Sequence, residues 1–461
     1  NTLSVDQVRQ DLEYLYRTLE AAHYDLYAHT PKAVFEKEYR RIQSSVRAPL
    51  TILEAHRLFQ RFAALPSIGH CRLEFPYPIY DDYSRRGGVV FPFDVAFRGE
   101  GRVVILRDHS GNHSVAPGDQ LLSIDGEPVN SVLEQLYEYT SGERMYLKQA
   151  ALEMISLPRK LWYTRGTANS YEVVLAKPDG SKVQTLAKPV PASRFEMDRK
   201  NIEIFDLKRE FKFIDGVAYL KPGPFYNFSG PQYFDTTSFD DLLASAFAQV
   251  RQRNSRHLIL DLRNNPGGES FFSDRLVAYF ATKPFHFASK FHLRTSRVSK
   301  ENFSRDVPPL LKDAPPTIAR EVQRQLKAVL SHPDGERFEF PIPEHPIHPE
   351  ATRFTGDVHV LINRHSYSNA TTTAALMQDY GFGTLVGEET ADLPTTYASI
   401  SSFTLPRSNL RVTYPRSYFV RPSGDRRVRG VTPDYVVSDD VLTGEDEVLN
   451  AAVRRAKVQT R

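Results

Sequence analysis

Two serines stand where an apolar segment runs into a helical pattern, in the stretch LINRHSYSNATTTAALMQDYG at residues 361–381. Ser366 and Ser368 lie just before that pattern begins. A serine at this position usually caps the helix, because its hydroxyl satisfies a free N–H of the first turn. The same position also places a hydroxyl near the positive end of the helix dipole, which stabilises alkoxide-like charge. The stretch alone leaves a helix cap and a nucleophile open.

A glycine pair offers the second part of such chemistry. Gly267 and Gly268 follow the apolar run of SRHLILDLRNNPGGES, which is typical of a buried strand. Without a Cβ, the backbone N–H groups of this turn can approach a ligand closely. Two such donors aimed at a developing negative charge form an oxyanion hole. An ordinary tight turn is the alternative.

The elements before these motifs differ along the chain. In residues 1–85 apolar residues recur at helical spacing, and Ser4 with Gln7 and Thr51 with Glu54 fit capping boxes, so we expect a helical N-terminal domain. Residues 86–192 change to short β-like runs separated by Gly and Asn/Asp turns.

The segment VAPGDQLLSIDGEPV within this β-rich region resembles the corresponding part of PDZ domains. Such domains bind an extended peptide as an added strand at a sheet edge. The preceding run RRGGVVFPF is the candidate carboxylate-receiving edge. A simple hairpin with an Asp-Gly turn is the alternative, so the sequence predicts a PDZ-like β domain with that alternative open.

Residues 193–461 alternate strand and helix patterns, which predicts an α/β core. A Pro-rich, charged stretch at about 296–350 interrupts them and is expected to be an insertion, either a lid or a solvated loop. Within it, TIAREVQRQLKAVL is the one expected helix.

Composition narrows the possible partners and cofactors. Lys and Arg number 59 and Asp and Glu 56, a net charge of +3 that argues against nucleic acid as the main partner. No apolar run approaches the roughly 20 residues needed to cross a bilayer. The single cysteine, Cys71, excludes an intramolecular disulfide. The start NTLSVDQVRQ, without an initiator Met, is expected to be processed or trimmed.

No motif for a metal or nucleotide stands out. His345 and His348 in PEHPIHPE are spaced for a metal, but the prolines forbid the helix that would align them, and no Cys is near. No phosphate-cradling glycine loop and no G-x-S-x-G elbow occurs. We therefore expect no cofactor.

Three motifs in order, LILDLRNNPGG, VLINRHSYSNATTTAALMQDYGFGTLVGEET and GVTPDYVV, resemble the C-terminal processing peptidases and tricorn core proteases. The resemblance covers about residues 205–440 and the order of helical, PDZ-like and core regions. It implies a ClpP/crotonase-like α/β core, a serine endopeptidase that forms an acyl-enzyme on polypeptide substrates, and a secreted or periplasmic bacterial protein. It implies no metal or organic cofactor.

The same resemblance assigns roles to residues. In that family the second serine of a Ser-x-Ser pair before the helix is the nucleophile, which matches Ser368 and leaves Ser366 structural. The N–H of Asn369 matches one oxyanion donor, and Gly267 or Gly268 the other.

The resemblance also implies that the general base is a histidine. Many members use a lysine just after the counterpart of VGEET, but here Ala391, Asp392 and Leu393 stand there, and no Lys or Arg occurs between Ser368 and Arg407. The tricorn-like branch uses a histidine, which matches His70 in LPSIGHCRLEF. A histidine pKa near ~6.5 suits a base at neutral pH.

The orienting acid is the least defined member. Some relatives carry a Glu three residues before the Gly-Val-x-Pro-Asp motif, where this chain has Arg427. Asp425 is the candidate substitute, Glu388 and Glu389 are further candidates, and a Ser–His dyad held by a backbone carbonyl is the remaining alternative. If catalysis has been lost, the rival function is a non-proteolytic peptide- or ligand-binding protein on the same fold.

Overall fold

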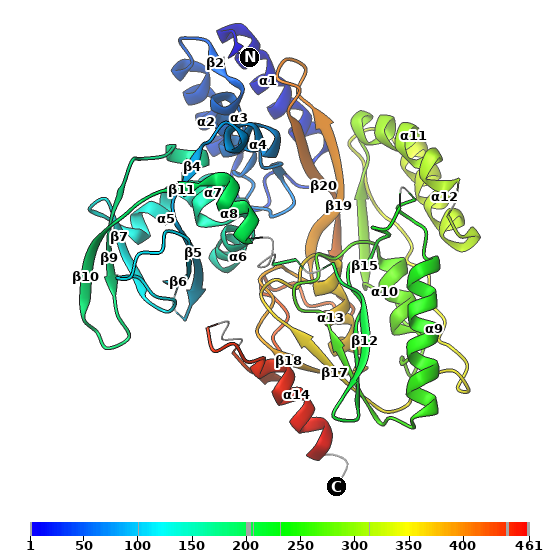
Figure 1. Cartoon of the computed structure of the whole chain (residues 1–461). Helices are drawn as coiled ribbons and strands as arrows, with labels where there is room; N and C mark the ends of the chain where they lie inside the picture. Colours follow the sequence, from blue (N-terminus) through cyan, green and yellow to red (C-terminus); the bar gives the residue numbers. More distant parts are fainter. Residues whose placement is uncertain are drawn as a thin grey trace.

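The computed structural model describes residues 2–99, 101–199, 204–205, 207–230, 232–312, 314–438 and 442–458 (Figure 1). The chain begins with the elements β1 (Thr2–Leu3), α1 (Val5–Ala22), α2 (Lys32–Ser45), β2 (Leu50–Thr51), α3 (Ile52–Ala63), β3 (Arg72–Leu73) and α4 (Tyr77–Arg85). Both expected capping boxes are present, at Ser4 and at Thr51. Their hydroxyls and the partner side chains satisfy N–H groups that would otherwise be free at the helix starts.

The β-rich region forms its own sheet. Its elements are β4 (Val89–Val90), β5 (Phe93–Arg98), β6 (Arg102–Asp108), β7 (Gln120–Ile124), β8 (Glu127–Pro128), α5 (Val129–Tyr137), α6 (Met145–Ile155), α7 (Leu157–Arg165), β9 (Tyr171–Ala176), β10 (Lys182–Ala187), β11 (Val190–Pro191) and α8 (Ala192–Arg199). The strand order is β10-β9-β7-β6-β5, with β8 paired to β7. Val89 and Val90 pair with β11, so that part of the expected peptide edge is already hydrogen-bonded. The assignment of this region as PDZ-like stays a prediction.

The core is an α/β layer structure, as predicted. Its elements are β12 (Glu210–Ile214), β13 (Val217–Lys221), α9 (Thr237–Gln252), β14 (His257–Asp261), α10 (Ser270–Val277), β17 (Asp357–Ile362), α13 (Asn369–Tyr380), β18 (Thr384–Gly387), β21 (Tyr435–Val436) and α14 (Glu447–Val458). The strand order is β12-β13-β14-β17-β18-β21, and every pair after β12–β13 is parallel. Apolar residues of α9, α10 and α13 cover one face of the sheet, and those of α14 cover the other.

A second sheet joins the core to the N-terminal helices. It consists of β15 (Lys290–Arg294), β16 (Arg337–Glu339), β19 (Thr396–Thr404) and β20 (Arg411–Val420) in the order β16-β15-β20-β19, with β3 paired to β20. Figure 1 shows the β19–β20 ribbon running between the N-terminal helices and the core. Phe403, Val412 and Tyr414 of this ribbon are buried in the same cluster as residues of α1 and α3.

The stretch at 296–350 holds two helices where one was expected: α11 (Arg297–Leu311) and α12 (Pro316–Ser331). The expected helix is α12. The unexpected α11 begins at a capping box formed by Ser296 and Ser299 and contains Pro308 and Pro309. Prolines inside a helical pattern argue against a helix, because each removes an N–H donor and crowds the preceding turn. Here the capped start outweighs that signal.

No helix of the described residues is long and apolar enough to cross a membrane.

Close approach of the backbone makes one glycine of the core sheet sensitive. Gly387 has φ +128°, and a Cβ added there would lie 2.1 Å from the carbonyl oxygen of Ile362. Gly387→Ala should therefore lower the free energy of unfolding by at least about 2 kcal/mol in urea titrations. Gly335→Ala is the matched control, because Gly335 has φ +85° with nothing within 4 Å of the added Cβ. Equal losses in the two variants would contradict the steric explanation.

Candidate active site

Ser368 is the N-cap residue of α13, with φ 52° and ψ −121°, yet its side chain makes no capping hydrogen bond. A positive φ in a residue with a side chain costs roughly 1–3 kcal/mol and persists only where the surroundings enforce it. The residue is partly exposed. The hydroxyl is thus not used as a cap and stands at the positive end of a 12-residue helix.

Hydrogen bonds join the loop before α13 to the loop after β14. The Ser366 hydroxyl donates to the Leu262 carbonyl at 2.9 Å and accepts from the Asn363 N–H at 3.1 Å. The Tyr367 N–H donates to the Asn265 carbonyl at 3.0 Å. The fully buried Ser366 therefore has a structural place, and it sets the turn that presents Ser368.

The glycine turn lies directly against this serine. A Cβ added to Gly267, whose φ is +86°, would lie 2.6 Å from the Asn369 nitrogen and 2.8 Å from the Ser368 Cβ. The Gly267 N–H donates to the Asn265 side chain at 2.8 Å, so it is engaged. Within the described residues, the N–H groups of Gly268 and Asn369 donate to no acceptor. Of the two candidate glycines, Gly268 is the one with a free donor.

His70 lies just before β3, buried with 1% of its surface exposed. Its ring packs against that of Tyr367, the residue before Ser368, with centroids 5.4 Å apart. Burial and the Arg72 guanidinium lower the pKa of His70 to about 3, and a hydrogen bond with the Tyr397 backbone acts in the opposite direction. The Nδ1 atom is buried with no hydrogen-bond partner in the described part of the chain. The imidazole is therefore neutral, which differs from the pKa near neutrality expected from sequence.

The structure brings His70 to the nucleophile loop without joining it to Ser368: no hydrogen bond links the two among the described residues. Arg72 makes the connection between the two loops. Its Nη1 donates to the Gly69 carbonyl at 2.6 Å and to the Tyr367 hydroxyl at 3.4 Å. The two predicted residues thus share a neighbourhood held by Arg72 and Tyr367.

Asp392 is a residue of this site that the sequence did not single out. Its carboxylate accepts a hydrogen bond from the Ser368 N–H at 2.6 Å, and only 1% of the residue is exposed. Burial raises the pKa of Asp392 to about 6, although two backbone donors and Arg72 act against the shift. The only signal in the sequence is positional, because Asp392 stands where the lysine of the lysine-using branch was sought.

Glu143, from the loop before α6, is a second carboxyl group that the sequence did not indicate. It accepts from the Gly69 N–H at 3.2 Å, next to His70 in the chain. Burial and the neighbouring Asp392 raise the pKa of Glu143 to about 8. Glu143 is therefore protonated at pH 7, whereas Asp392 is mostly ionised.

None of the candidate acids contacts His70 within the described residues. The Asp425 carboxylate accepts from the N–H and the guanidinium of Arg427, which hold the pKa of Asp425 well below its usual range. Glu388 pairs with Arg364, and Glu389 pairs with Arg144 and accepts from the Gly430 N–H. Each of these carboxylates already has a cationic partner, and the His70 ring bonds to the backbone of Tyr397.

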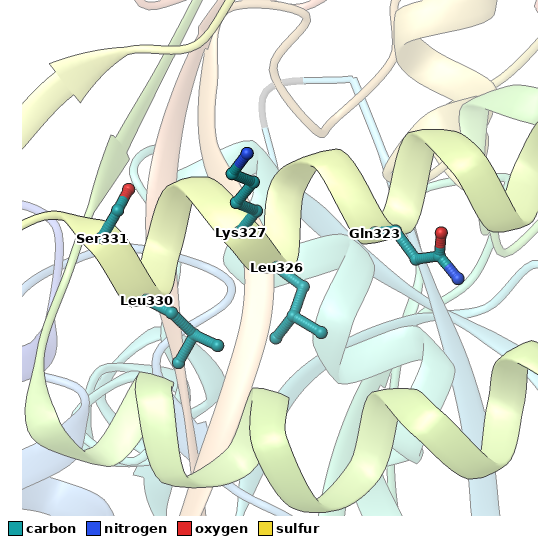
Figure 2. A pocket seen from close by; sticks show the side chains of 5 residues that line it. All are labelled: Gln323, Leu326, Lys327, Leu330 and Ser331. Atoms are coloured by element: carbon teal, nitrogen blue, oxygen red, sulfur yellow. The ribbon is translucent and has the colours of Figure 1, made fainter.

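A surface hollow and a histidine pair lie apart from these residues. Figure 2 shows Leu326 and Leu330 of α12 pointing into the hollow beside the neighbouring helix, with Lys327 pointing away. His345 stacks on Phe285, and His348 packs on Tyr279. Among the described residues, no group of three His, Cys, Asp or Glu side chains could hold a metal.

Comparison with known proteins agrees with the geometry of the core. Residues 226–437 match the model of peptidase family S41. The fold is similar to that of mature CPAF, with 17% identity, a TM-score of 0.68, and coverage of 98% of this chain and 96% of that one. Mature CPAF complexed with lactacystin aligns at 16% identity with a TM-score of 0.67, over 98% and 97% of the two chains. The photosystem II D1 C-terminal processing protease aligns at 14% identity and a TM-score of 0.42, over 93% and 92%.

The matched region begins just after β13 and contains the glycine turn, the Ser-x-Ser pair and the Gly-Val-x-Pro-Asp motif. These are the three motifs that carried the resemblance in the sequence. The core that carries the candidate site, residues 226–437, therefore matches peptidase family S41, a family of serine-type peptidases.

Proposed function

We propose that this protein is a serine endopeptidase in which Ser368 is the nucleophile, His70 the general base, and the N–H groups of Gly268 and Asn369 the oxyanion hole. One observation carries the proposal. Ser368 has a strained backbone and an uncapped hydroxyl at the start of α13, directly against the Gly267 turn. Strain of this kind is held at functional sites, whereas a serine used as a cap needs none.

Two properties support these N–H groups as oxyanion donors: they have no acceptor in the described structure, and they lie beside Ser368. A free N–H of the first helical turn points away from the helix body, where it has no intrahelical acceptor. The Asn369 N–H meets this condition, and the Gly268 N–H is the neighbouring free donor. Two donors that are already oriented stabilise a tetrahedral oxyanion without reorganising during the reaction.

The imidazole of His70 is neutral and its Nδ1 lacks a partner in the described structure, so this nitrogen is free to accept the Ser368 proton. In the free enzyme such catalytic contacts are often long, and they tighten when substrate is bound. Because none of the candidate carboxylates contacts the ring, the Tyr397 backbone orients it in this proposal, which is the dyad alternative raised by the sequence.

The substrates are polypeptides, as the family match implies. We place peptide recruitment on the β5–β10 sheet as a PDZ-like function, and the protein in the periplasm or outside the cell. Both rest on the resemblance seen in the sequence. The rival function is a non-proteolytic binding protein, and it is favoured by the absence of a Ser368–His70 hydrogen bond in this conformation.

Two serine variants separate chemistry from structure. Ser368→Ala should abolish fluorophosphonate labelling and casein hydrolysis, while its Tm stays within about 2 °C of wild type because the lost hydroxyl makes no cap. Ser366→Ala should instead lower the free energy of unfolding by about 1–3 kcal/mol, because it leaves the buried Asn363 N–H without its acceptor. Cleavage by Ser368→Ala at the wild-type rate would remove Ser368 as the nucleophile.

The base can be tested with a second pair of variants. His70→Ala should lose activity as severely as Ser368→Ala, and the double variant should be little worse, because groups that act together give non-additive losses. The matched control is His56→Ala. His56 is equally buried, but it bonds the Tyr163 hydroxyl and the Glu74 carbonyl, so its loss should affect stability alone. Fully additive losses in kcat/KM for the Ser368 and His70 variants would contradict the pairing.

A further inference from the structure

The strained backbone conformation of Ser368 must be stabilised by neighbouring residues, and Asp392 is hydrogen-bonded to that backbone. The backbone at φ 52° is unfavourable for serine, so the surroundings must supply interactions that a relaxed turn would lose. The Ser368 N–H donates to the Asp392 carboxylate at 2.6 Å. Hydrogen bonds from a neutral N–H to an ionised carboxylate are roughly twice as strong as those between neutral groups.

The Asp392 backbone is itself anchored. The Thr390 hydroxyl donates to the Asp392 carbonyl at 2.9 Å, and the Ala391 N–H donates to the Arg364 carbonyl at 3.3 Å. Arg144 donates to the Thr390 and Ala391 carbonyls at 2.9 and 3.1 Å. The carboxylate therefore projects from a rigid turn and can act as a fixed acceptor for the nucleophile loop.

The groups that face Asp392 come from three other parts of the chain. Arg72 of β3 and Arg144 before α6 favour its charged form, and that charge raises the pKa of the neighbouring Glu143. The Tyr367 hydroxyl also faces it from the nucleophile loop. Burial is the largest influence on Asp392, and it disfavours the charged form. A buried carboxylate therefore lowers the stability of the fold, which a neutral hydrogen-bond acceptor at the same place would not do.

We infer that Asp392 is a positioning residue for the proposed peptidase reaction: its carboxylate fixes the Ser368 backbone so that the hydroxyl and the Asn369 N–H face the same reacting carbonyl. The inference rests on the proposed function. Asp392 stands at the position where other members carry a lysine base. In this chain the residue at that position holds the backbone of the nucleophile and does not deprotonate its hydroxyl.

A pH profile distinguishes this role from a structural one. As the pH falls through about 6, Asp392 takes up a proton and the Ser368 N–H loses its charged acceptor, so the labelling rate should fall. The pKa of His70 lies at about 3, so that residue does not titrate in this range. Asp392→Asn keeps a neutral acceptor and cannot ionise, so its profile should be flat from pH 5 to 7.

Stability should move in the opposite direction to activity. A carboxyl group whose folded pKa lies above its unfolded value of about 3.9 makes the fold less stable as the pH rises toward the folded pKa. That loss is complete above about pH 6 for Asp392. Asp392→Asn should therefore have a Tm at pH 7.5 no lower than that of wild type, although it is less active.

The experiment compares wild type, Asp392→Asn, Asp392→Ala and Asp11→Asn, with Ser368→Ala as the blank. Fluorophosphonate labelling rates and the kcat and KM for a short chromogenic peptide are measured from pH 5 to 8, with Tm for each protein. Asp392→Ala should lose at least ~tenfold in kcat at pH 7.5 with KM little changed, and Asp392→Asn should lose less. Asp11 is the matched control: it is fully buried, and it accepts the Arg407 and Ser408 N–H groups far from Ser368. Asp11→Asn should lower Tm and leave kcat unchanged.

The outcomes separate the two proposals. Wild type labelled at Ser368, together with Asp392→Ala labelled at the same rate, would overturn this inference and leave the proposed function standing. Wild type that is never labelled would overturn both. If Asp392→Ala does not fold, Asp392→Asn decides, and retention of the wild-type inflection near pH 6 in that variant overturns the inference.

Discussion

The parallel pairing of β14 with β17 is the constraint on which the site depends. Residues 257–261 run beside residues 357–361 in register, and the Leu262 N–H extends the ladder to the Leu361 carbonyl. Parallel neighbours end at the same edge of a sheet, which is where ligands bind in such folds. The glycine turn and the nucleophile loop therefore emerge side by side, and backbone and serine hydrogen bonds then lock them together.

The remaining part of the site comes from the other end of the chain. His70 is held by β3, a two-residue strand paired with β20 of the long hairpin. Carboxylates and guanidinium groups fill the space between this strand and the nucleophile loop: Glu143 binds Gly69, Arg72 binds Tyr367, and Asp392 binds Ser368. Glu143 is protonated at pH 7, and the Arg72 and Arg144 guanidinium groups favour the ionised form of Asp392, whereas an unpaired ion in the same place would be strongly destabilising.

The sequence predicted well whatever depended on local pattern. The α/β alternation and the capping boxes follow from periodicity and from the spacing of cap residues, whereas the structural place of Ser366 was implied by the family resemblance; all three are present in the structure. The sequence could not decide whether Gly267 or Gly268 supplies the oxyanion donor. That choice depends on which of the two N–H groups is bonded to the Asn265 side chain. Asp392 could not be predicted as a site residue, because a single carboxylate in a loop carries no periodic signal. It reaches the site through a hydrogen bond with Ser368, 24 residues away in the chain.

The pairing of β3 with β20 also orders events during biosynthesis. The Thr413 hydroxyl of β20 donates to the Arg72 carbonyl across 341 residues of sequence. Contacts at such separation form late, because the chain between them must first be made and ordered. A ribosome-bound chain therefore carries His70 long before the strand that holds it in place exists. On the proposed mechanism the enzyme has no peptidase activity until β20 has been made and has paired with β3.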